Sequence, residues 1–236
     1  PDGSGRLTYK SLADRIAVRS ASEAPAAITS SAADSNNVFL SDGMRLYIIG
    51  HGGDSVIVSD LEKNYGLRNV SALLIFDNRL IIADDREGLY DYNGGEARRL
   101  PGGEKTAPAS FVRLLPYDRE NLLIGDAQRD LRLFNIRTGT LRSLKAGGEG
   151  KTAPGRGLLA DIALLPGNQI AAGFTDRGGV YIFSHEGKLL QQISDRTGSV
   201  TESSVTAMYC HYTSNSQLWF CTIGFINRAY VSMPAS

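Results

Sequence analysis

Two lysine–threonine pairs are the first residues in this sequence whose type and spacing suggest chemistry. Gly150-Lys151-Thr152 has the ending of a phosphate-binding loop, in which glycines, a lysine and a hydroxyl residue surround a nucleotide phosphate. Such a loop needs another glycine five residues before Gly150, and Lys145 stands there. The same tetrapeptide, Lys-Thr-Ala-Pro, begins 46 residues earlier at Lys105, where no glycine precedes the lysine. We therefore expect no nucleotide site and interpret the duplication as the sign of an internal repeat.

Cysteine and histidine are too few and too scattered for a metal site. They are Cys210, Cys221, His51, His185 and His211. A closed zinc site needs four ligands at short spacing, so we expect no metal and no cofactor. The two cysteines fall on neighbouring expected strands, where the register decides whether they are opposite, diagonal or on different faces. Two buried free thiols are the favoured interpretation, although an oxidising compartment would permit a disulfide.

Charge and hydropathy exclude several classes of partner. The 236 residues carry 25 basic and 25 acidic side chains without a basic block, so we expect no nucleic-acid partner. Apolar residues make up 42% of the chain, in short runs far below the roughly 18 that span a membrane. We expect no membrane contact in this segment. Because Pro1-Asp2-Gly3 is unlike a native N-terminus, we also expect a longer parent protein. A membrane anchor elsewhere in that parent protein is compatible with this expectation.

Five segments share one pattern, in which a short apolar run is followed by a polar turn and a second alternating run. They are residues 45–60, 79–94, 121–139, 169–187 and 217–232. Alternation with a period of two indicates strands, and each segment is typical of a β-hairpin. Aligned apolar residues recur at Leu46, Leu80, Leu122, Ile170 and Leu218, at intervals of 34, 42, 48 and 48 residues. That period is expected for one four-stranded blade of a β-propeller.

Further apolar runs complete these expected blades. Inner strands precede four hairpins at 71–78, 111–120, 160–168 and 205–216, and outer strands follow three of them at 96–102, 140–148 and 188–195. Residues 21–37, which are rich in alanine and serine, are either a long loop or a degenerate inner strand around residues 27–31. We predict an all-β fold, a single β-propeller domain over residues 1–236 with about five four-stranded blades.

The expected blades cover approximately residues 26–70, 71–104, 109–148, 157–198 and 204–236. The last of them has three strands only, while residues 5–12 form an orphan strand near the N-terminus. If these two pieces pair, the ring closes and its exposed strand edges disappear. The sequence leaves open whether five blades form a complete ring or part of a larger propeller.

The last copy of the repeat resembles a known family. Residues 205–236 are similar to the two-component regulator propeller repeats of bacterial sensor proteins, with matching positions at Val205, Met208, Leu218, Trp219 and Arg228. The family's usual Asp, Gly and Gly-Thr are replaced near Asn215, Ser216, Cys221 and Thr222. Earlier copies fit more loosely, and the resemblance covers residues 38–236.

This resemblance implies a non-catalytic sensor or ligand-binding domain of a bacterial signal-transduction protein. In the family, such propellers are periplasmic or otherwise extracytoplasmic, and the enzymatic activity belongs to a separate domain. No kinase, cyclase or response-regulator signature occurs in this chain. The expected partner is a small polar ligand or a protein, and a homodimer is compatible with the pattern. The alternative is a carbohydrate-binding or glycoside-hydrolysing propeller, for which Asp161 and Glu202 are candidate carboxylates without a recognisable signature.

Polar residues gather in two kinds of loop that share one face of a propeller. These are the turns between the second and third strands of a blade and the connections between blades, and we call the shared face the entry face. The candidate ligand-binding residues there are Asp85, Arg86, Lys105, Arg129, Asp130, Lys151, Asp176 and Arg177. Turn chemistry alone explains the aspartates and glycines but not the recurring arginines. For the two lysines, the favoured interpretation is a duplicated connector, and the alternative is a shared anion site.

Trp219 is the sole tryptophan and lies in an expected strand. Packing between blades is its favoured role, and a stacking platform for a sugar is the alternative. A lectin with one sugar site per blade should repeat an aromatic contact in every copy, which a single tryptophan does not support.

Overall fold

A computed structural model describes residues 27–50, 56–127, 130–144, 157–176, 178–200, 204–211, 217–222 and 224–230. These residues form five antiparallel sheets, which we call sheets A to E in chain order. In each sheet, the strands are neighbours in the order in which they follow one another along the chain. Repeated hairpins therefore build every sheet, as the alternating sequence pattern predicts.

The strand bounds follow the repeat. Sheet A contains β1 (Ser30–Ala33), β2 (Asn37–Ser41), β3 (Arg45–Gly50) and β4 (Val56–Asp60). Sheet B contains β5 (Val70–Phe76), β6 (Arg79–Asp84), β7 (Gly88–Asn93) and β8 (Glu96–Arg99). Sheet C contains β9 (Phe111–Pro116), β10 (Asn121–Asp126), β11 (Asp130–Asn135) and β12 (Leu141–Ser143). Sheet D contains β13 (Leu159–Leu165), β14 (Gln169–Phe174), β15 (Gly179–Phe183) and β16 (Leu189–Ile193). Sheet E contains β17 (Val205–His211), β18 (Gln217–Thr222) and β19 (Phe225–Tyr230).

Within the described residues, three short helices lie between strands. They are α2 (Leu61–Tyr65), η1 (Gly103–Thr106) and η2 (Pro166–Asn168). Helix α2 begins at Asp60, whose side chain accepts a hydrogen bond from the Lys63 main chain, and ends at Gly66 in the left-handed conformation. No helix within the described part of the chain is long and apolar enough to cross a membrane.

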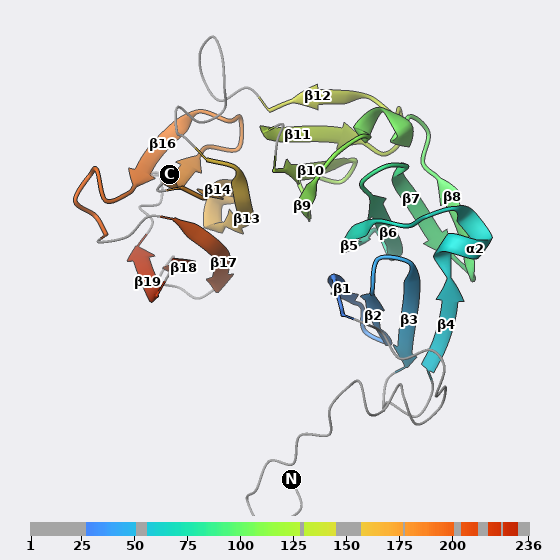
Figure 1. Cartoon of the computed structure of the whole chain (residues 1–236). Coiled ribbons are helices and arrows are strands. Elements are labelled where there is room, and N and C mark those ends of the chain that lie inside the picture. The colour runs from blue at the N-terminus through green and yellow to red at the C-terminus, as the bar shows by residue number, and fades with distance from the viewer. Residues whose placement is uncertain are drawn as a thin grey trace, which may run out of the picture.

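The five sheets stand in an arc, with sheets A and E at its two ends (Figure 1). The first strands of consecutive sheets, β1, β5, β9, β13 and β17, lie next to one another and line the inner side of this arc. The sequence left open whether the alanine- and serine-rich segment before the first hairpin is a loop or an inner strand. The structure shows an inner strand there, β1, at Ser30–Ala33. Radially arranged four-stranded antiparallel sheets define the architecture of a propeller.

Among the described residues, the hydrophobic core has four layers, one between each pair of consecutive sheets, and a fifth cluster on the face of sheet A that points away from sheet B. Leu46 and Ile82 share the layer between sheets A and B, and Ala83 and Leu114 share the next. Phe183 belongs to the layer between sheets C and D, and Phe220 to that between D and E. Burying one such side chain contributes about 1.5–3 kcal/mol, so sheet stacking supplies most of the driving force for folding.

Four of the inner strands carry an irregularity at the same place. The register of β5, β9, β13 and β17 against the next strand shifts at the second residue of each strand, at Ser71, Val112, Ala160 and Thr206. The residues that follow these bulges are Ala72, Arg113, Asp161 and Ala207. Because the bulge recurs at one position of the repeat, these four residues are structurally equivalent in sheets B to E.

Sheet E has three strands among the described residues, and no described strand pairs with the outer edge of β19. Residues 5–12, the expected closing strand, lie outside the described residues, so closure of the ring stays a prediction. The register of sheet E pairs Cys210 with Leu218 and Cys221 with Ala207, which places the two cysteine positions on opposite faces. Cys221 is a free thiol.

Candidate functional site

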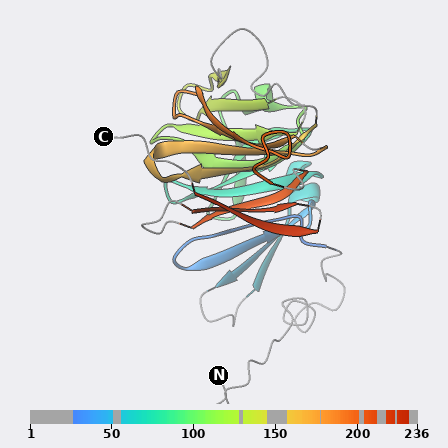
Figure 2. The same ribbon diagram turned by 90° about the vertical axis from the view of Figure 1, so that its left-hand side faces the viewer.

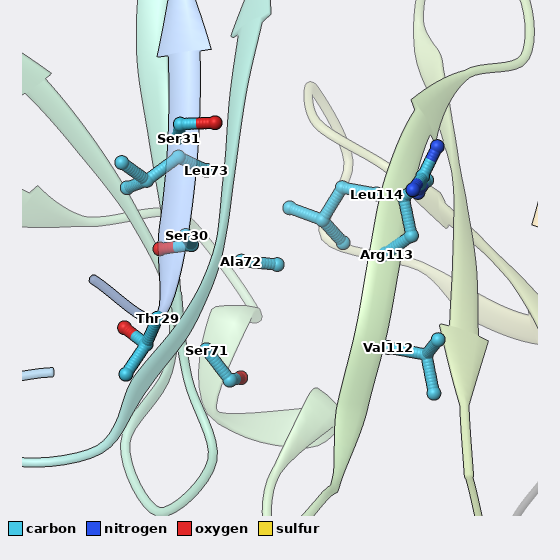
Figure 3. Close-up of a pocket in the computed structure, with 9 residues that line it drawn as sticks. All are labelled: Thr29, Ser30, Ser31, Ser71, Ala72, Leu73, Val112, Arg113 and Leu114. Atoms are coloured by element: carbon cyan, nitrogen blue, oxygen red, sulfur yellow. The ribbon is translucent and has the colours of Figure 1, made fainter. Parts of the chain in front are cut away.

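A polar recess opens where three inner strands begin. It has a volume of about 410 Å³ and is lined by Thr29, Ser30, Ser31, Ser71, Ala72, Leu73, Val112, Arg113 and Leu114. These residues come from β1, β5 and β9 and from the residue before β1. Figure 3 shows the residues of β1 and β5 standing across the recess from those of β9. We call this space the channel recess, because inner strands surround it.

The channel recess combines hydroxyl groups with one guanidinium group. The Thr29 hydroxyl lies 3.1 Å from the main-chain oxygen of Ser41 and 3.0 Å from that of Val70, so its single proton is shared between sheet A and the start of sheet B. The hydroxyl of Ser30 is buried and has no hydrogen-bond partner. A buried hydroxyl without a partner is costly and rare. The wall of the recess thus contains one buried polar atom that no described group satisfies.

Arg113 is held in place from the neighbouring sheet. Its Nε lies 2.9 Å from Oδ1 of Asp161 and its Nη2 lies 3.2 Å from Oδ2, so the pair is bidentate. Such a fork fixes the plane of the guanidinium group. A guanidinium group has five N–H donors, and the carboxylate occupies two of them. The Arg113 side chain is 43% exposed, which leaves the remaining donors open to a ligand.

Asp161 in turn connects three sheets. Besides Arg113 of sheet C, its carboxylate accepts hydrogen bonds from the main-chain nitrogen of Met208 in sheet E (2.7 Å) and from that of Ile162 (2.8 Å). Burial raises the pKa of the Asp161 carboxyl, although the Met208 N–H, the Arg113 charge and the Ile162 N–H oppose this effect. The saturated carboxylate is therefore a structural tie beside the recess rather than a free base.

Asp85, the first of the candidate residues, is hydrogen-bonded to Ser71 of the channel recess. Its Oδ1 accepts from the hydroxyl of Ser71 (2.6 Å) and from the main-chain nitrogen of Phe111 (3.1 Å), so it joins sheet B to sheet C. The neighbouring Asp84 is fully buried and accepts from the main-chain nitrogens of Asn69, Arg86 and Glu87. Both carboxylates thus hold the turn between β6 and β7 against the starts of inner strands.

Arg86 is exposed and borders a second, smaller space. This hollow of about 270 Å³ is lined by Gly66, Arg68, Asn69, Asp84, Arg86 and Glu87. Arg68 pairs with Glu62 (3.2 Å) and Glu87 pairs with Arg99 (2.6 Å). The hollow lies between the connection from sheet A to sheet B and the β6–β7 turn. These are the two kinds of loop that we expected to meet on the entry face.

Lys105 lies in the connector between sheets B and C. Its Nζ donates to the main-chain oxygen of Gly139 in the β11–β12 turn (3.1 Å). The next residue, Thr106, is buried and donates to the Gly103 oxygen, and its own oxygen accepts from Arg132 of β11 (3.2 Å). Residues 105–106 therefore fasten one blade to the next.

The remaining candidates are placed as follows. Asp176 is exposed in the turn between β14 and β15, with a φ of 52° that suits a tight turn. Asp130 is the first residue of β11, and nothing is described of its side chain. Arg129, Lys151 and Arg177 lie outside the described residues. Among the described candidates, Asp85 is hydrogen-bonded to a residue of the channel recess, Arg86 lines the smaller hollow, and Lys105 donates to the β11–β12 turn.

Sequence reasoning missed the residues that line the channel recess. Arg113 interrupts the apolar inner strand "FVRLLP", and Asp161, which the sequence offered only as a candidate hydrolase carboxylate, interrupts "LLADIALL" at the equivalent position. A charged residue within an otherwise apolar inner strand is the signal that could have identified Arg113. Ser71 and Ser30 gave no comparable signal, because serine is common in strands and turns alike.

Comparison with known proteins supports a propeller fold. No family model matches the chain, and no curated protein matches it. Among solved structures, it is similar to the WD40 beta propeller domain of Doa1, with 16% identity, a TM-score of 0.50, and coverage of 87% of this chain and 79% of that one. It is also similar to virginiamycin B lyase from Staphylococcus aureus, with 11% identity, a TM-score of 0.60, and coverage of 88% and 71%.

A third similarity agrees with the family resemblance of the last repeat. The chain is similar to the extracellular domain of BT4673 from B. thetaiotaomicron, described once as a one component and once as a hybrid two component system. Identity is 19% and 17%, the TM-score is 0.67 in both, and coverage of this chain is 88% and 90%. The match spans 28% of that protein's chain. The fold is thus that of a propeller, while identities this low carry no role, ligand or activity.

Proposed function

We propose that this chain is a non-catalytic sensor propeller of a bacterial signal-transduction protein, located outside the cytoplasm, and that it binds a small polar ligand at the entry side of its channel. Three observations support the proposal. They are the resemblance of residues 205–236 to sensor propeller repeats, the fold shared with an extracellular sensor domain, and the polar channel recess.

The single observation that carries the ligand site is the guanidinium group of Arg113, which Asp161 holds in a fixed plane and which is 43% exposed at a recess of about 410 Å³. Hydroxyl residues of β1 and β5 stand on the opposite side of the same recess. Ligand sites combine a concave space with a few fixed polar groups. A small molecule that carries hydroxyl or carboxylate groups fits this set, and Asp85 positions the Ser71 hydroxyl in the same recess.

A thermal-shift screen against sugars, amino acids, carboxylic acids and nucleotides tests the proposal. We expect one class to raise the melting temperature of the wild-type chain and to lose this effect in Arg113→Gln. Arg98→Gln is the matched control, because Arg98 is 82% exposed on β8 and pairs only with Glu96. If every class leaves the melting temperature unchanged, or if Arg98→Gln abolishes the effect as well, the ligand site is wrong. A protein partner docking on the entry face would then be the next candidate.

The carbohydrate alternative makes a different prediction. A hydrolase needs two carboxylates with separate roles, and Asp161 is already bound by two main-chain N–H groups and by Arg113. We therefore expect no release of chromophore from nitrophenyl glycosides, whereas non-hydrolytic sugar binding would agree with the proposed site. Steady turnover that survives further purification would contradict a non-catalytic role.

Closure of the ring by residues 5–12 is part of the same proposal. The outer edge of β19 has no partner among the described strands, which leaves a place for a fourth strand in sheet E. Removal of residues 1–12 should lower the melting temperature strongly if this strand is in place. An unchanged melting temperature would reject closure without affecting the channel recess.

A further inference from the structure

The two sides of the channel recess differ in what they can offer to a ligand. The recess lies where the inner strands begin, and Figure 2 shows the arc from the side, with the strands running between two faces on which the turns gather. A molecule in the recess meets residues of β1 and β5 on one side and residues of β9 on the other (Figure 3). The donors and acceptors on these two sides decide which class of molecule fits.

Ser71 has already used its only proton. Its hydroxyl donates to Oδ1 of Asp85 at 2.6 Å, and the direction of this bond is fixed because an ionised carboxylate only accepts. Oδ1 of Asp85 is held in turn by the main-chain N–H of Phe111 at 3.1 Å. A serine oxygen keeps lone pairs after it has donated its proton. Toward a molecule in the recess, Ser71 therefore acts only as an acceptor.

Thr29 is in the same condition as Ser71. Its proton is shared between two main-chain carbonyl oxygens, which only accept, so its own oxygen can only accept from a ligand. Of the two other hydroxyls on this side, that of Ser30 is buried in the wall, whereas Ser31 is exposed and its hydroxyl can turn either way. The side formed by β1 and β5 thus calls for a ligand group that donates.

The side formed by β9 has the opposite character. Arg113 is the charged residue among the nine described residues that line the recess, and a guanidinium group only donates. Asp161 takes two of its N–H groups, and the others suit a carboxylate, which guanidinium groups bind through paired hydrogen bonds. On the other side, the charge bonded to Ser71 is the negative one of Asp85. The recess is therefore polarised from β9 to β5.

We propose that the ligand of the channel recess is a small amino- or hydroxycarboxylate. Its carboxylate binds Arg113, and its ammonium or hydroxyl group donates to the Ser71 oxygen, with Thr29 as a second acceptor. A plain carboxylate leaves these acceptors without a donor, and a neutral sugar leaves Arg113 without a counter-charge. The volume of about 410 Å³ is near the lower end of the range of about 300–1,000 Å³ for ligand pockets, which suits a small molecule. This inference rests on the proposed function, because it names the ligand class of the same site.

Isothermal titration with a matched set of compounds tests this inference. Butanoate, 2-hydroxybutanoate and 2-aminobutanoate differ only in the group on the second carbon, and their amides lack the carboxylate charge. We expect at least one of the substituted acids to bind the wild-type chain about two- to tenfold more tightly than butanoate, the value of one hydrogen bond. It should bind at least about tenfold more tightly than its amide, which cannot pair with the charge of Arg113. The tighter of the two acids shows whether the donor is a hydroxyl or an ammonium group.

Ser71→Ala shows whether this hydroxyl acts as the acceptor. The variant should lose the preference for the substituted acid over butanoate and keep its affinity for butanoate, whereas a purely structural role of Ser71 would weaken both alike. Ser184→Ala is the matched control. Its hydroxyl also donates to a carboxylate, that of Glu186 at 2.8 Å, but it lies in the β15–β16 turn outside the recess.

The inference is overturned if butanoate binds the wild-type chain as tightly as both substituted acids, or if the amides bind as tightly as the acids. It is also overturned if Ser71→Ala keeps the preference or if Ser184→Ala loses it. When another class from the thermal-shift screen binds and loses affinity in Arg113→Gln, while this set does not bind, the site is right and the ligand class is wrong. If no class binds at all, the proposed function is rejected together with the inference.

Discussion

Asp161 and Arg113 occupy equivalent positions in consecutive blades and form a bidentate ion pair, with Nε to Oδ1 at 2.9 Å and Nη2 to Oδ2 at 3.2 Å. Both residues follow a bulge in their inner strands. The equivalent residues in sheets B and E, Ala72 and Ala207, are small and uncharged. The repeat thus places a cation and an anion side by side at one step of the ring, and it leaves room beside Ala72 for the channel recess.

Asp161→Asn should destabilise the fold by roughly 1–3 kcal/mol, since it turns one acceptor oxygen into a donor. Each carboxylate oxygen faces one main-chain N–H and one Arg113 nitrogen, so either orientation of the amide sets N–H against N–H. Urea unfolding measures the loss. Glu96→Gln is the control, as Glu96 contacts only an exposed arginine, and a loss of similar size there would contradict the role of Asp161.

The pH dependence of stability has a defined sign at Asp161. Burial raises the pKa of its carboxyl above the ordinary value of 3.8, so the folded chain binds this proton more tightly than the unfolded chain. The contribution of Asp161 to stability is therefore largest below pH 3.8 and falls as the pH rises through the folded pKa. We therefore expect the difference in unfolding free energy between the wild type and Asp161→Asn to decrease as the pH rises from 3.8 through the folded pKa. A difference that grows with pH would show a lowered pKa instead.

Gly173 and Gly125 test how closely the sheets stack. A Cβ at Gly173 would lie 2.6 Å from Cγ1 of Val205, whereas one at Gly125 would lie 3.1 Å from the flexible end of Ile162. Gly173→Ala should cost about 1–3 kcal/mol through overpacking between sheets D and E, and Gly125→Ala should cost less. Thermal melts of both variants give the order directly. Equal melting temperatures would mean that the two interfaces are equally able to adjust.

Tyr117 links the β9–β10 turn to the β15–β16 turn. Its hydroxyl donates to the main-chain oxygen of His185 at 2.6 Å, and the two rings stack with centres 4.1 Å apart. Tyr117→Phe removes the hydrogen bond and keeps the stacking, so we expect a loss of about 0.5–1.5 kcal/mol. Tyr65→Phe removes a more exposed bond to Gly95 and should cost less in the same chemical denaturation experiment. The reverse order would contradict the importance of the Tyr117 contact.

Much of the fold could be predicted from the sequence, because period-two alternation marks each strand and the repeat marks each sheet. The inner strand at Ser30–Ala33 was ambiguous, since alanine and serine carry almost no hydrophobic pattern. The site could be predicted only in part. Asp85 follows from turn chemistry, but its acceptance of the Ser71 hydroxyl does not. Arg113 and Asp161 are 48 residues apart, and only the bulges and the sheet stacking bring them together.

The central claim is that a small polar ligand occupies the channel recess and hydrogen-bonds to Arg113. Isothermal titration of Arg113→Gln with the best ligand class from the thermal-shift screen tests it most directly, with Arg98→Gln as the control. Loss of a hydrogen bond to a charged group should weaken ligand binding by about tenfold or more. Binding of undiminished affinity by Arg113→Gln would contradict the account.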